Sequence, residues 1–214
     1  MVTLDRVSSF VKSFISDDQG FLGEIYAKAI KDMVPVMRPE TREFIKTQLL
    51  IKKPLNIVEV GTAVGYSALY MSQFISEEAH ITTIELDEDR VREATANIKA
   101  AGKENQITVL QGDAALVLQT LNTEEYDFAF VDAAKGQYIN YLPDVKRILK
   151  SEGLVISDNI LQDGEVLESH FVVEKRNRTI HDRMREYLYV ITHDQELSTA
   201  ILSVADGIAV SIKK

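Results

Sequence analysis

The sequence predicts an α/β fold in which a mostly parallel seven-stranded sheet carries helices on both faces, behind a helical N-terminal extension. Three observations support this prediction. From residue 56 onward, short β-branched runs alternate with segments of helical periodicity. The first run ends in a turn that contains Gly61 and Gly65, and helical spacing resumes after it. The last two runs, Leu197–Val204 and Gly207–Ile212, are close enough to form a hairpin, so that one strand is antiparallel.

The first 55 residues are predicted to be helical. Apolar residues recur at helical spacing in two segments, namely Leu4, Val7, Phe10, Val11 and Phe14, and then Leu22, Ile25, Ala29 and Ile30. Pro39 is placed near the start of a third helix, since proline is favoured in the first turn. These helices form the N-terminal extension of a single domain, residues 1–214.

The alternating part of the chain is divided as follows. Strands are predicted over residues 56–60, 80–85, 106–110, 126–131 and 153–157. Helices are predicted over residues 64–75, 87–100, 113–121 and 138–149, with a further helix near 171–189. Asp87 is the expected N-cap of the second of these helices.

Composition indicates one soluble domain. The chain has 214 residues, of which 45% are hydrophobic and 27% are charged, and this is enough for one sizeable core. Apolar runs fall short of the roughly 20 residues that span a bilayer, and the N-terminus does not resemble a signal peptide. The absence of cysteine excludes disulfides, thiolate metal sites and a cysteine nucleophile. We therefore expect a cytoplasmic protein without a membrane partner.

The net charge of −9 is unevenly distributed. Residues 56–170 carry 8 basic and 20 acidic side chains, whereas residues 1–55 and 171–190 each have a net charge of +2. One interpretation is that the basic side chains are solvated helix faces. The other is that the two basic segments contact an anionic substrate.

The motif Glu59-x-Gly61-x-x-x-Gly65, followed by Ser67, indicates a cofactor site. A strand, a glycine turn and a helix bring a ligand close to main-chain N–H groups at a helix N-terminus. The spacing differs from the Gly-x-Gly-x-x-Gly of dinucleotide sites. An acidic residue two positions before the first glycine suits a ligand with a cationic end and no phosphate, and S-adenosylmethionine has this character.

Acidic residues follow the next two strands, at the sheet edge where ligands bind in this class of fold. Glu85 comes 24 residues after Gly61, where a carboxylate can accept hydrogen bonds from both ribose hydroxyls. Asp113 and Ala114 are placed to meet the adenine amino group. The alternative interpretations are a solvated acid at a helix start for Glu85 and a simple N-cap for Asp113.

A second group of residues predicts a metal site. Asp132 and Asp158-Asn159 follow adjacent apolar runs, so their oxygens can converge. Three oxygen donors without imidazole or thiolate select a hard cation such as Mg²⁺, with Mn²⁺ or Ca²⁺ as alternatives. Two vicinal oxygens of an acceptor could chelate there, and Lys135 is placed to stabilise the oxyanion or to remove its proton. Helix caps and a surface lysine are the alternative.

Taken together, these motifs resemble the cation-dependent class I O-methyltransferases, which include caffeoyl-CoA and catechol O-methyltransferases. The resemblance covers about residues 30–214 and implies the Rossmann-like methyltransferase fold and a homodimer. It implies S-adenosylmethionine contacts at Glu59, Gly61, Gly65, Ser67, Glu85, Asp113, Ala114 and Asp132, with Met37 in addition. It also implies metal ligation by Asp132, Asp158 and Asn159, and catalysis by Lys135 with Asp132.

The acceptor is the point on which two hypotheses remain. The compact chain is most similar to the bacterial tRNA 5-hydroxyuridine methyltransferases, which make 5-methoxyuridine at the wobble position. It has no tryptophan, unlike the plant enzymes, and carries a basic stretch in place of their long substrate-recognition insertion. The leading hypothesis is therefore a tRNA anticodon loop held by basic residues, namely Arg38, Arg176, Arg178 and Arg183.

The alternative hypothesis keeps the chemistry but uses a small catechol-like or caffeoyl-CoA-like acceptor. Both acceptors present two vicinal oxygens, so the metal site alone does not distinguish them. A third hypothesis, a non-catalytic S-adenosylmethionine-binding module, is disfavoured by the intact set Asp132, Lys135, Asp158 and Asn159.

Overall fold

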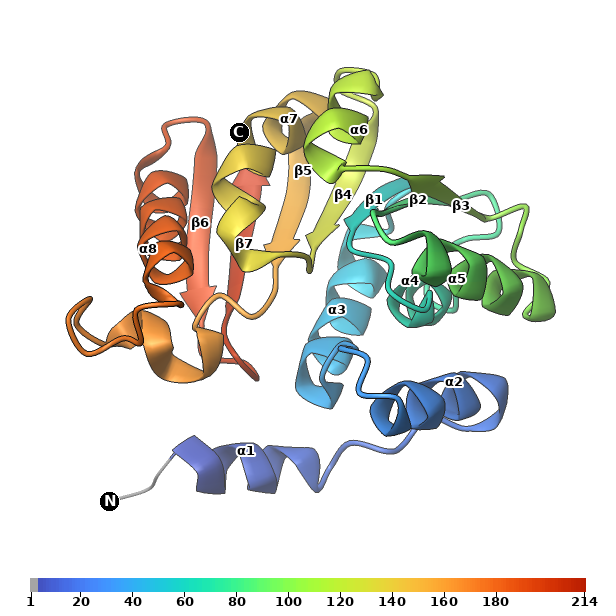
Figure 1. Cartoon of the computed structure of the whole chain (residues 1–214). Coiled ribbons are helices and arrows are strands. Elements are labelled where there is room, and N and C mark those ends of the chain that lie inside the picture. Colours follow the sequence, from blue (N-terminus) through green and yellow to red (C-terminus); the bar gives the residue numbers. More distant parts are fainter. Residues whose placement is uncertain (1–3) are drawn as a thin grey trace.

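A computed structural model describes residues 4–214, and Met1–Thr3 lie outside the described part. Its centre is one seven-stranded sheet with the strand order β3-β2-β1-β4-β5-β7-β6 (Figure 1). Pairing is parallel from β3 to β5, whereas β7 is antiparallel to both of its neighbours. The strands are β1 (Asn56–Val60), β2 (His80–Glu85), β3 (Ile107–Gln111), β4 (Tyr126–Val131), β5 (Leu149–Ser157), β6 (Leu197–Leu202) and β7 (Ile208–Lys213). The predicted fold class is thereby confirmed.

Helices pack on both faces of the sheet. One apolar core lies between the sheet and α3 (Pro39–Lys52), α4 (Tyr66–Met71) and α5 (Glu88–Ala100), with α2 (Gly20–Lys31) packed outside α4. The other core lies beneath α6 (Ala114–Thr120), α7 (Tyr138–Ile148) and α8 (Arg178–His193). Because both faces of the inner strands are buried, most of their side chains are apolar, and Glu59 of β1 with Thr82 and Thr83 of β2 are buried polar exceptions.

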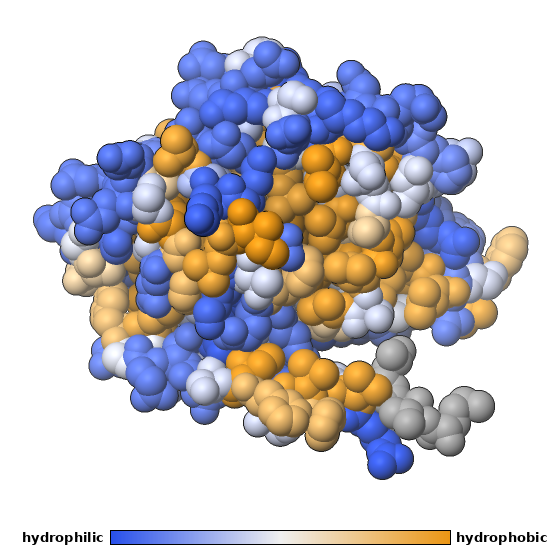
Figure 2. Space-filling model, turned by 180° about the vertical axis from the view of Figure 1, so that it is seen from behind, coloured by the Kyte–Doolittle hydropathy of each residue, from blue (hydrophilic) through white to orange (hydrophobic). Residues whose placement is uncertain are grey.

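The N-terminal helix α1 (Leu4–Lys12) lies at the periphery of the fold (Figure 1) and contacts α3 through Ser8 and Lys12, which both bind Glu40. The apolar side chains of Val7, Phe10 and Val11 are exposed, with Phe10 at 66%, and Phe14, just beyond the end of the helix, is 73% exposed. The view from behind shows apolar side chains along this helix and over the middle of the same side of the molecule (Figure 2). Ile212 of β7 and Leu50 of α3 are also exposed.

Several predicted boundaries were wrong. The helix after β1 was expected over residues 64–75 but is regular only over Tyr66–Met71, because Gly65 with φ +80° is its N-cap and a turn follows Ser72. Strand β5 begins at Leu149, four residues before the expected start, because Leu149 pairs with Tyr126 ahead of a register irregularity between Tyr126 and Phe128. The helix near 171–189 begins only at Arg178 and continues to His193.

The carboxyl ends of the parallel strands meet at one edge of the sheet, and the segments that follow them close this edge. The short helices η1 (Lys135–Gln137) and η2 (Gln162–Leu167) come directly after β4 and β5. Ligand sites of such sheets lie at this edge. None of the helices formed by residues 4–214 combines the length and apolar character that crossing a bilayer requires.

Candidate active site

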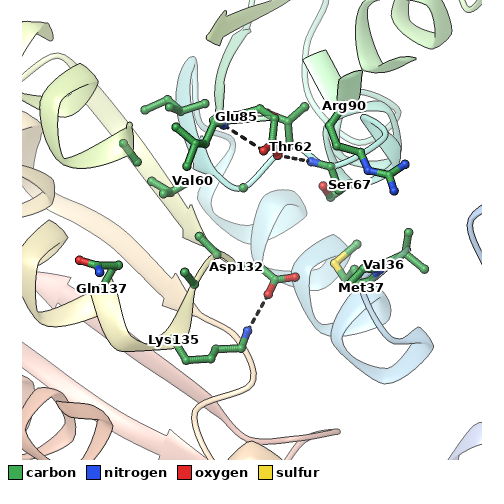
Figure 3. Close-up of a pocket in the computed structure, with 18 of the residues that line it drawn as sticks. Val36, Met37, Val60, Thr62, Ser67, Glu85, Arg90, Asp132, Lys135 and Gln137 are labelled. Atoms are coloured by element: carbon green, nitrogen blue, oxygen red, sulfur yellow. Dashed lines mark hydrogen bonds and ion pairs between the residues drawn. The ribbon is translucent and has the colours of Figure 1, made fainter. Parts of the chain in front are cut away.

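A pocket of about 750 Å³ lies at the carboxyl ends of β1, β2, β3 and β4 (Figure 3). Seven of the residues that the sequence predicted for the cofactor line it, namely Met37, Gly61, Ser67, Glu85, Asp113, Ala114 and Asp132. Glu59 and Gly65 stand behind these residues and do not line the pocket. Residues from four strand ends therefore converge on one cavity, as the sequence predicted.

The glycine turn after β1 requires its glycines. Gly61 has φ +103°, and a Cβ atom there would overlap the main-chain carbonyl of Asp132. Gly65 has φ +80° and packs against α5, where a Cβ atom added to it would lie only 3.3 Å from the Ala94 Cβ. The close approach at Gly61 brings the end of β1 against the loop after β4. The residues predicted for the cofactor and those predicted for the metal are therefore adjacent at this contact.

Glu85 is held in place by main-chain amides. Its Oε2 accepts from Ala63 N at 2.9 Å, and its Oε1 accepts from Leu86 N at 2.9 Å and Asp87 N at 3.0 Å. Each carboxylate oxygen has further lone pairs, so the group can still accept from a ligand hydroxyl. The carboxylate thus fixes the glycine turn and faces the pocket at the same time (Figure 3).

Glu59 is a buried carboxyl group. Its Oε2 accepts from Thr83 Oγ1 at 2.5 Å, and Thr83 is in turn hydrogen-bonded to Thr62. Its Oε1 has no hydrogen-bond partner among residues 4–214. Burial, with a smaller contribution from the negative charges of Asp132 and Glu85, raises the pKa of Glu59 to about 7. An unpaired, buried acceptor beside the pocket suits a donor supplied by a ligand.

Asp113 caps α6 through the hydrogen bond from Ala115 N to its Oδ1, at 2.9 Å. Asp87 caps α5 in the predicted way, accepting from Arg90 N. Asp113 lines the pocket while it caps the helix, so the confirmed N-cap is compatible with a contact to adenine, which stays a prediction.

A second pocket of about 980 Å³ adjoins the first. The two share a wall that includes Val34, Pro35, Val36, Lys135 and Asn159. The second pocket combines an apolar side, formed by Tyr26, Ile30 and Ile180, with charged residues of both signs, namely Arg38, Lys135, Arg183, Asp163, Glu165 and Asp206. Lys135 lines both pockets, so a molecule bound in the second pocket would meet the first pocket beside Lys135.

Lys135 joins the predicted metal ligands. Its Nζ donates to Asp132 Oδ1 at 3.0 Å, to Asn159 Oδ1 at 2.8 Å and to the hydroxyl of Tyr138 at 3.3 Å. Figure 3 shows its side chain directed at Asp132. The ammonium therefore lies between oxygens that two different strand ends supply.

Asp158 follows β5 and is completely buried. Its Oδ1 accepts from Asn159 N at 2.8 Å and from Thr41 Oγ1 at 3.2 Å, whereas its Oδ2 has no partner among the described residues. Burial and the neighbouring charge of Asp132 raise the pKa of Asp158. A buried carboxylate with a free oxygen, next to a second carboxylate and an amide oxygen, is a set of donors that fits a hard divalent cation.

Two residues that support this site were not predicted. The buried Tyr138 hydroxyl lies 3.1 Å from the main-chain carbonyls of both Val131 and Asp158 and so joins the ends of β4 and β5. Thr41 comes from α3, 117 residues before Asp158. The spacing of Tyr138 three residues after Lys135 is a usable signal, but no local pattern links Thr41 to the site.

The four predicted substrate arginines are in different surroundings. Arg38 pairs with Asp163 at 2.7 Å, and Arg183 donates to Gly136 O at 3.1 Å; both line the second pocket. Arg178 donates to the carbonyls of residues 171 and 173. Arg176 pairs with Glu174 on the exterior. Only Arg38 and Arg183 are therefore part of the pocket wall.

Sequence comparison identifies relatives of the chain. A sequence model of the O-methyltransferase family matches residues 12–214. A caffeoyl-CoA O-methyltransferase of Stellaria longipes is 32% identical over 178 residues, which are 79% of this chain and 73% of that protein. A catechol O-methyltransferase of Niastella koreensis is 26% identical over 175 residues, covering 78% of this chain and 79% of that protein.

Structure comparison gives the same outline. A Staphylococcus aureus protein provisionally described as a caffeoyl-CoA O-methyltransferase superimposes with a TM-score of 0.89 and 29% identity, over 97% of this chain and 99% of that one. An O-methyltransferase of Bacillus cereus in complex with SAH has a TM-score of 0.84 and 23% identity, over 97% of each chain. The second likeness concerns the fold alone.

Proposed function

The chain belongs to the O-methyltransferase family, and from this premise we propose that it transfers a methyl group from S-adenosylmethionine to an oxygen acceptor at a divalent-cation site. The observation that carries the proposal concerns the buried residue Asp158, which lies beside Asp132 and Asn159. Its Oδ2 has no hydrogen-bond partner among residues 4–214. S-adenosylmethionine would occupy the first pocket, with its ribose at Glu85 and its adenine near Asp113 and Ala114.

The residues of the second site divide the chemistry. Asp132, Asp158 and Asn159 would hold the cation, which when bound lowers the pKa of an acceptor hydroxyl by its positive charge. Lys135 lies on the wall between the pockets, where its ammonium can stabilise the acceptor oxyanion or, once deprotonated, its amine can accept the proton. Thr41 and Tyr138 keep the carboxylate and the strand ends in position.

Metal removal tests this proposal directly. Excess chelator is expected to abolish methyl transfer, and Mg²⁺ or Mn²⁺ to restore it. Asp158→Asn should weaken Mg²⁺ binding measured by calorimetry, while the affinity for S-adenosylmethionine changes little. Full turnover in excess chelator would exclude the cation-dependent mechanism.

For the acceptor, we propose first the 5-hydroxyl of a wobble uridine in tRNA. The base offers two vicinal oxygens, and single-stranded loops present bases that can be splayed into a protein pocket. Support comes from the size of the second pocket and from Arg38 and Arg183 in its wall, where backbone phosphates of a loop could be held. The acidic net charge of the rest of the chain disfavours non-specific RNA binding.

A small catechol-like acceptor is the second candidate. Tyr26, Ile30 and Ile180 give the second pocket an apolar side on which an aromatic ring can pack, and Asp163, Glu165 and Asp206 make its rim partly acidic. The named activities of the Stellaria and Niastella relatives point in the same direction.

A paired substitution distinguishes the two acceptors. Arg38→Ala with Arg183→Ala should weaken tRNA binding and flatten its salt dependence by up to about one unit of slope per lost phosphate contact. Arg92→Ala, on the exposed side of α5, is the matched control and should bind tRNA as the parent does. If the parent leaves hydroxyuridine tRNA unmethylated and methylates a catechol, the small-acceptor candidate is correct.

The chain is further proposed to form a homodimer. Val7, Phe10 and Val11 of α1 are exposed, and further apolar side chains cover the middle of the same side of the molecule (Figure 2). Apolar surface of this kind is typical of an interface with another chain.

A further inference from the structure

Three side chains with metal-ligating atoms, His170, His181 and Asp182, gather at the start of α8, and none of them lines either pocket. His170 belongs to the segment between η2 and α8, and the other two belong to the first turns of α8. Asp182 Oδ1 is 2.8 Å from His170 Nδ1 and 3.1 Å from His181 Nδ1. One donor atom from each residue lies within 4.8 Å of the others.

These separations match those of ligands around one metal ion. Nitrogen and carboxylate oxygen ligands lie about 2.0–2.2 Å from zinc in tetrahedral sites, which places neighbouring ligand atoms roughly 3.3 Å apart. The two distances from Asp182 Oδ1 are close to this value. A small inward shift of exposed side chains would therefore complete the site without a change in the backbone.

The hydrogen bonds of His181 supply a second, independent observation. Its Nε2 lies 3.1 Å from the main-chain carbonyl of Glu168, which can only accept, so Nε2 carries a hydrogen. A metal ion binds a neutral imidazole, and with the hydrogen on Nε2 the atom left to bind it is Nδ1. This Nδ1 lies 3.1 Å from the carboxylate oxygen of Asp182, so both atoms can bind one ion.

The same arrangement is the one that orients a metal-binding histidine. Such a ring commonly donates its second N–H to a main-chain carbonyl, which fixes both its tautomer and its direction. The Glu168 carbonyl is itself held by Arg185 NH1 at 3.3 Å. His170 and Asp182 are partly exposed, which leaves a fourth position to water.

We propose that His170, His181 and Asp182 bind a first-row transition metal ion, and that this ion is zinc. The bound ion holds the 168–177 segment against α8. Two imidazoles and one carboxylate suit such an ion, whereas the oxygen-only set at Asp158 suits Mg²⁺. Ile180 and Arg183, next to the cluster in sequence, line the second pocket. The ion thereby stiffens one wall of the acceptor pocket and takes no part in the transfer itself.

The test uses the full chain without a histidine tag, in saturating Mg²⁺, titrated with ZnCl₂ and separately with CoCl₂. Calorimetry and the visible absorption of Co²⁺ are expected to show one ion per chain. His170→Ala should weaken binding by at least about tenfold, because loss of a group behind a ligand already costs about 10–100-fold. His193→Ala, at the exposed end of α8, is the matched control and keeps the parent affinity.

A local readout separates this site from the proposed active site. Zinc should slow amide hydrogen exchange in residues 168–181 of the parent and of His193→Ala, but not of His170→Ala. Asp158→Asn should keep the parent zinc affinity. If the parent binds no zinc, or binds it as tightly after His170→Ala, the proposal is overturned and the cluster is a protonated imidazole–carboxylate pair.

Discussion

Two glutamates of neighbouring strands, Glu59 and Glu85, show how position decides the state of a carboxyl group. Glu85, at the end of β2, is surrounded by three main-chain donors, so its charge is stabilised where a ribose would bind. Glu59, within β1, is buried with one hydroxyl donor, and its pKa is raised to about 7. Burial of the ionised carboxylate therefore costs folding free energy at Glu59, whereas three main-chain donors compensate the carboxylate of Glu85.

Glu59→Gln is expected to stabilise the ligand-free protein at alkaline pH. Because the folded-state pKa of Glu59 is raised from 4.5 to about 7, the parent loses stability as pH rises through this window, by up to about 3 kcal/mol. Glutamine does not titrate. Thermal unfolding at about pH 5 and about pH 8 should show the melting temperature of the variant rising relative to the parent at the higher pH. An unchanged difference would contradict the raised pKa.

Gly61→Ala should damage both stability and cofactor binding. Strain at φ +103° adds to the overlap with the Asp132 carbonyl, so a loss of about 3 kcal/mol or more is expected in chemical denaturation. Gly20→Ala is the control, because Gly20 also has a positive φ, +61°, but open space around its Cβ position. That variant should lose only about 1–2 kcal/mol. Equal losses in the two variants would mean that the close approach of the backbones is unimportant.

The residues of the site that could be predicted are those attached to strand ends. Asp132, Asp158 and Asn159 follow apolar runs directly, and parallel strands bring their ends together. Thr41 could not be predicted, since its contact with Asp158 depends on how α3 packs on the sheet. Arg176 and Arg178 were grouped with Arg183 by sequence proximity, but the turn before α8 directs them away from the second pocket.

At the scale of elements, Arg42 of α3 holds the segment that leads to α1. Its NH1 pairs with Asp18 at 2.7 Å and its NH2 donates to Ser16 O at 2.5 Å. Asp18 also accepts from the hydroxyl of Tyr66 in α4. The guanidinium side chain is only 4% exposed, so its loss would leave Asp18 as a poorly compensated charge.

Arg42→Ala should therefore cost about 3–5 kcal/mol, the usual effect of removing one partner of a buried pair. Urea denaturation measures it, with Lys46→Ala on the same helix as a surface control expected to cost less than about 1 kcal/mol. Adding Asp18→Ala to Arg42→Ala should recover part of the loss. A double variant that is less stable than Arg42→Ala would show that Asp18 stabilises the fold without the arginine, through its hydrogen bond with Tyr66, and would contradict an uncompensated charge.

The order of elements was predicted well because hydrophobic periodicity separates strands from helices along the whole chain. Ends of elements were predicted less well where tertiary contacts set them. Helix α4 is short because a glycine cap and a following turn limit it, and β5 begins early because Leu149 pairs with Tyr126 across an irregular register. Such contacts lie far apart in sequence, so local periodicity does not contain them.

At the scale of the whole molecule, substitutions in and next to α1 test the proposed homodimer. Phe10→Asp with Phe14→Asp places two charges on its exposed apolar face and should shift the protein to monomers at micromolar concentrations, measured by light scattering. Leu116→Asp, at an exposed apolar residue on α6, should leave the oligomeric state unchanged. A parent protein that is already monomeric would contradict the homodimer.

The two pockets are built mainly by different parts of the chain. The first pocket is built mainly by the strand ends and turns of residues 60–114, whereas the far side of the second is built by η2 and the start of α8. If the second pocket binds the acceptor as proposed, a graft that replaces residues 162–183 with those of a relative is expected to change acceptor specificity and to leave the first pocket intact. Acceptor specificity could then change by loop replacement, without new substitutions at the proposed S-adenosylmethionine site.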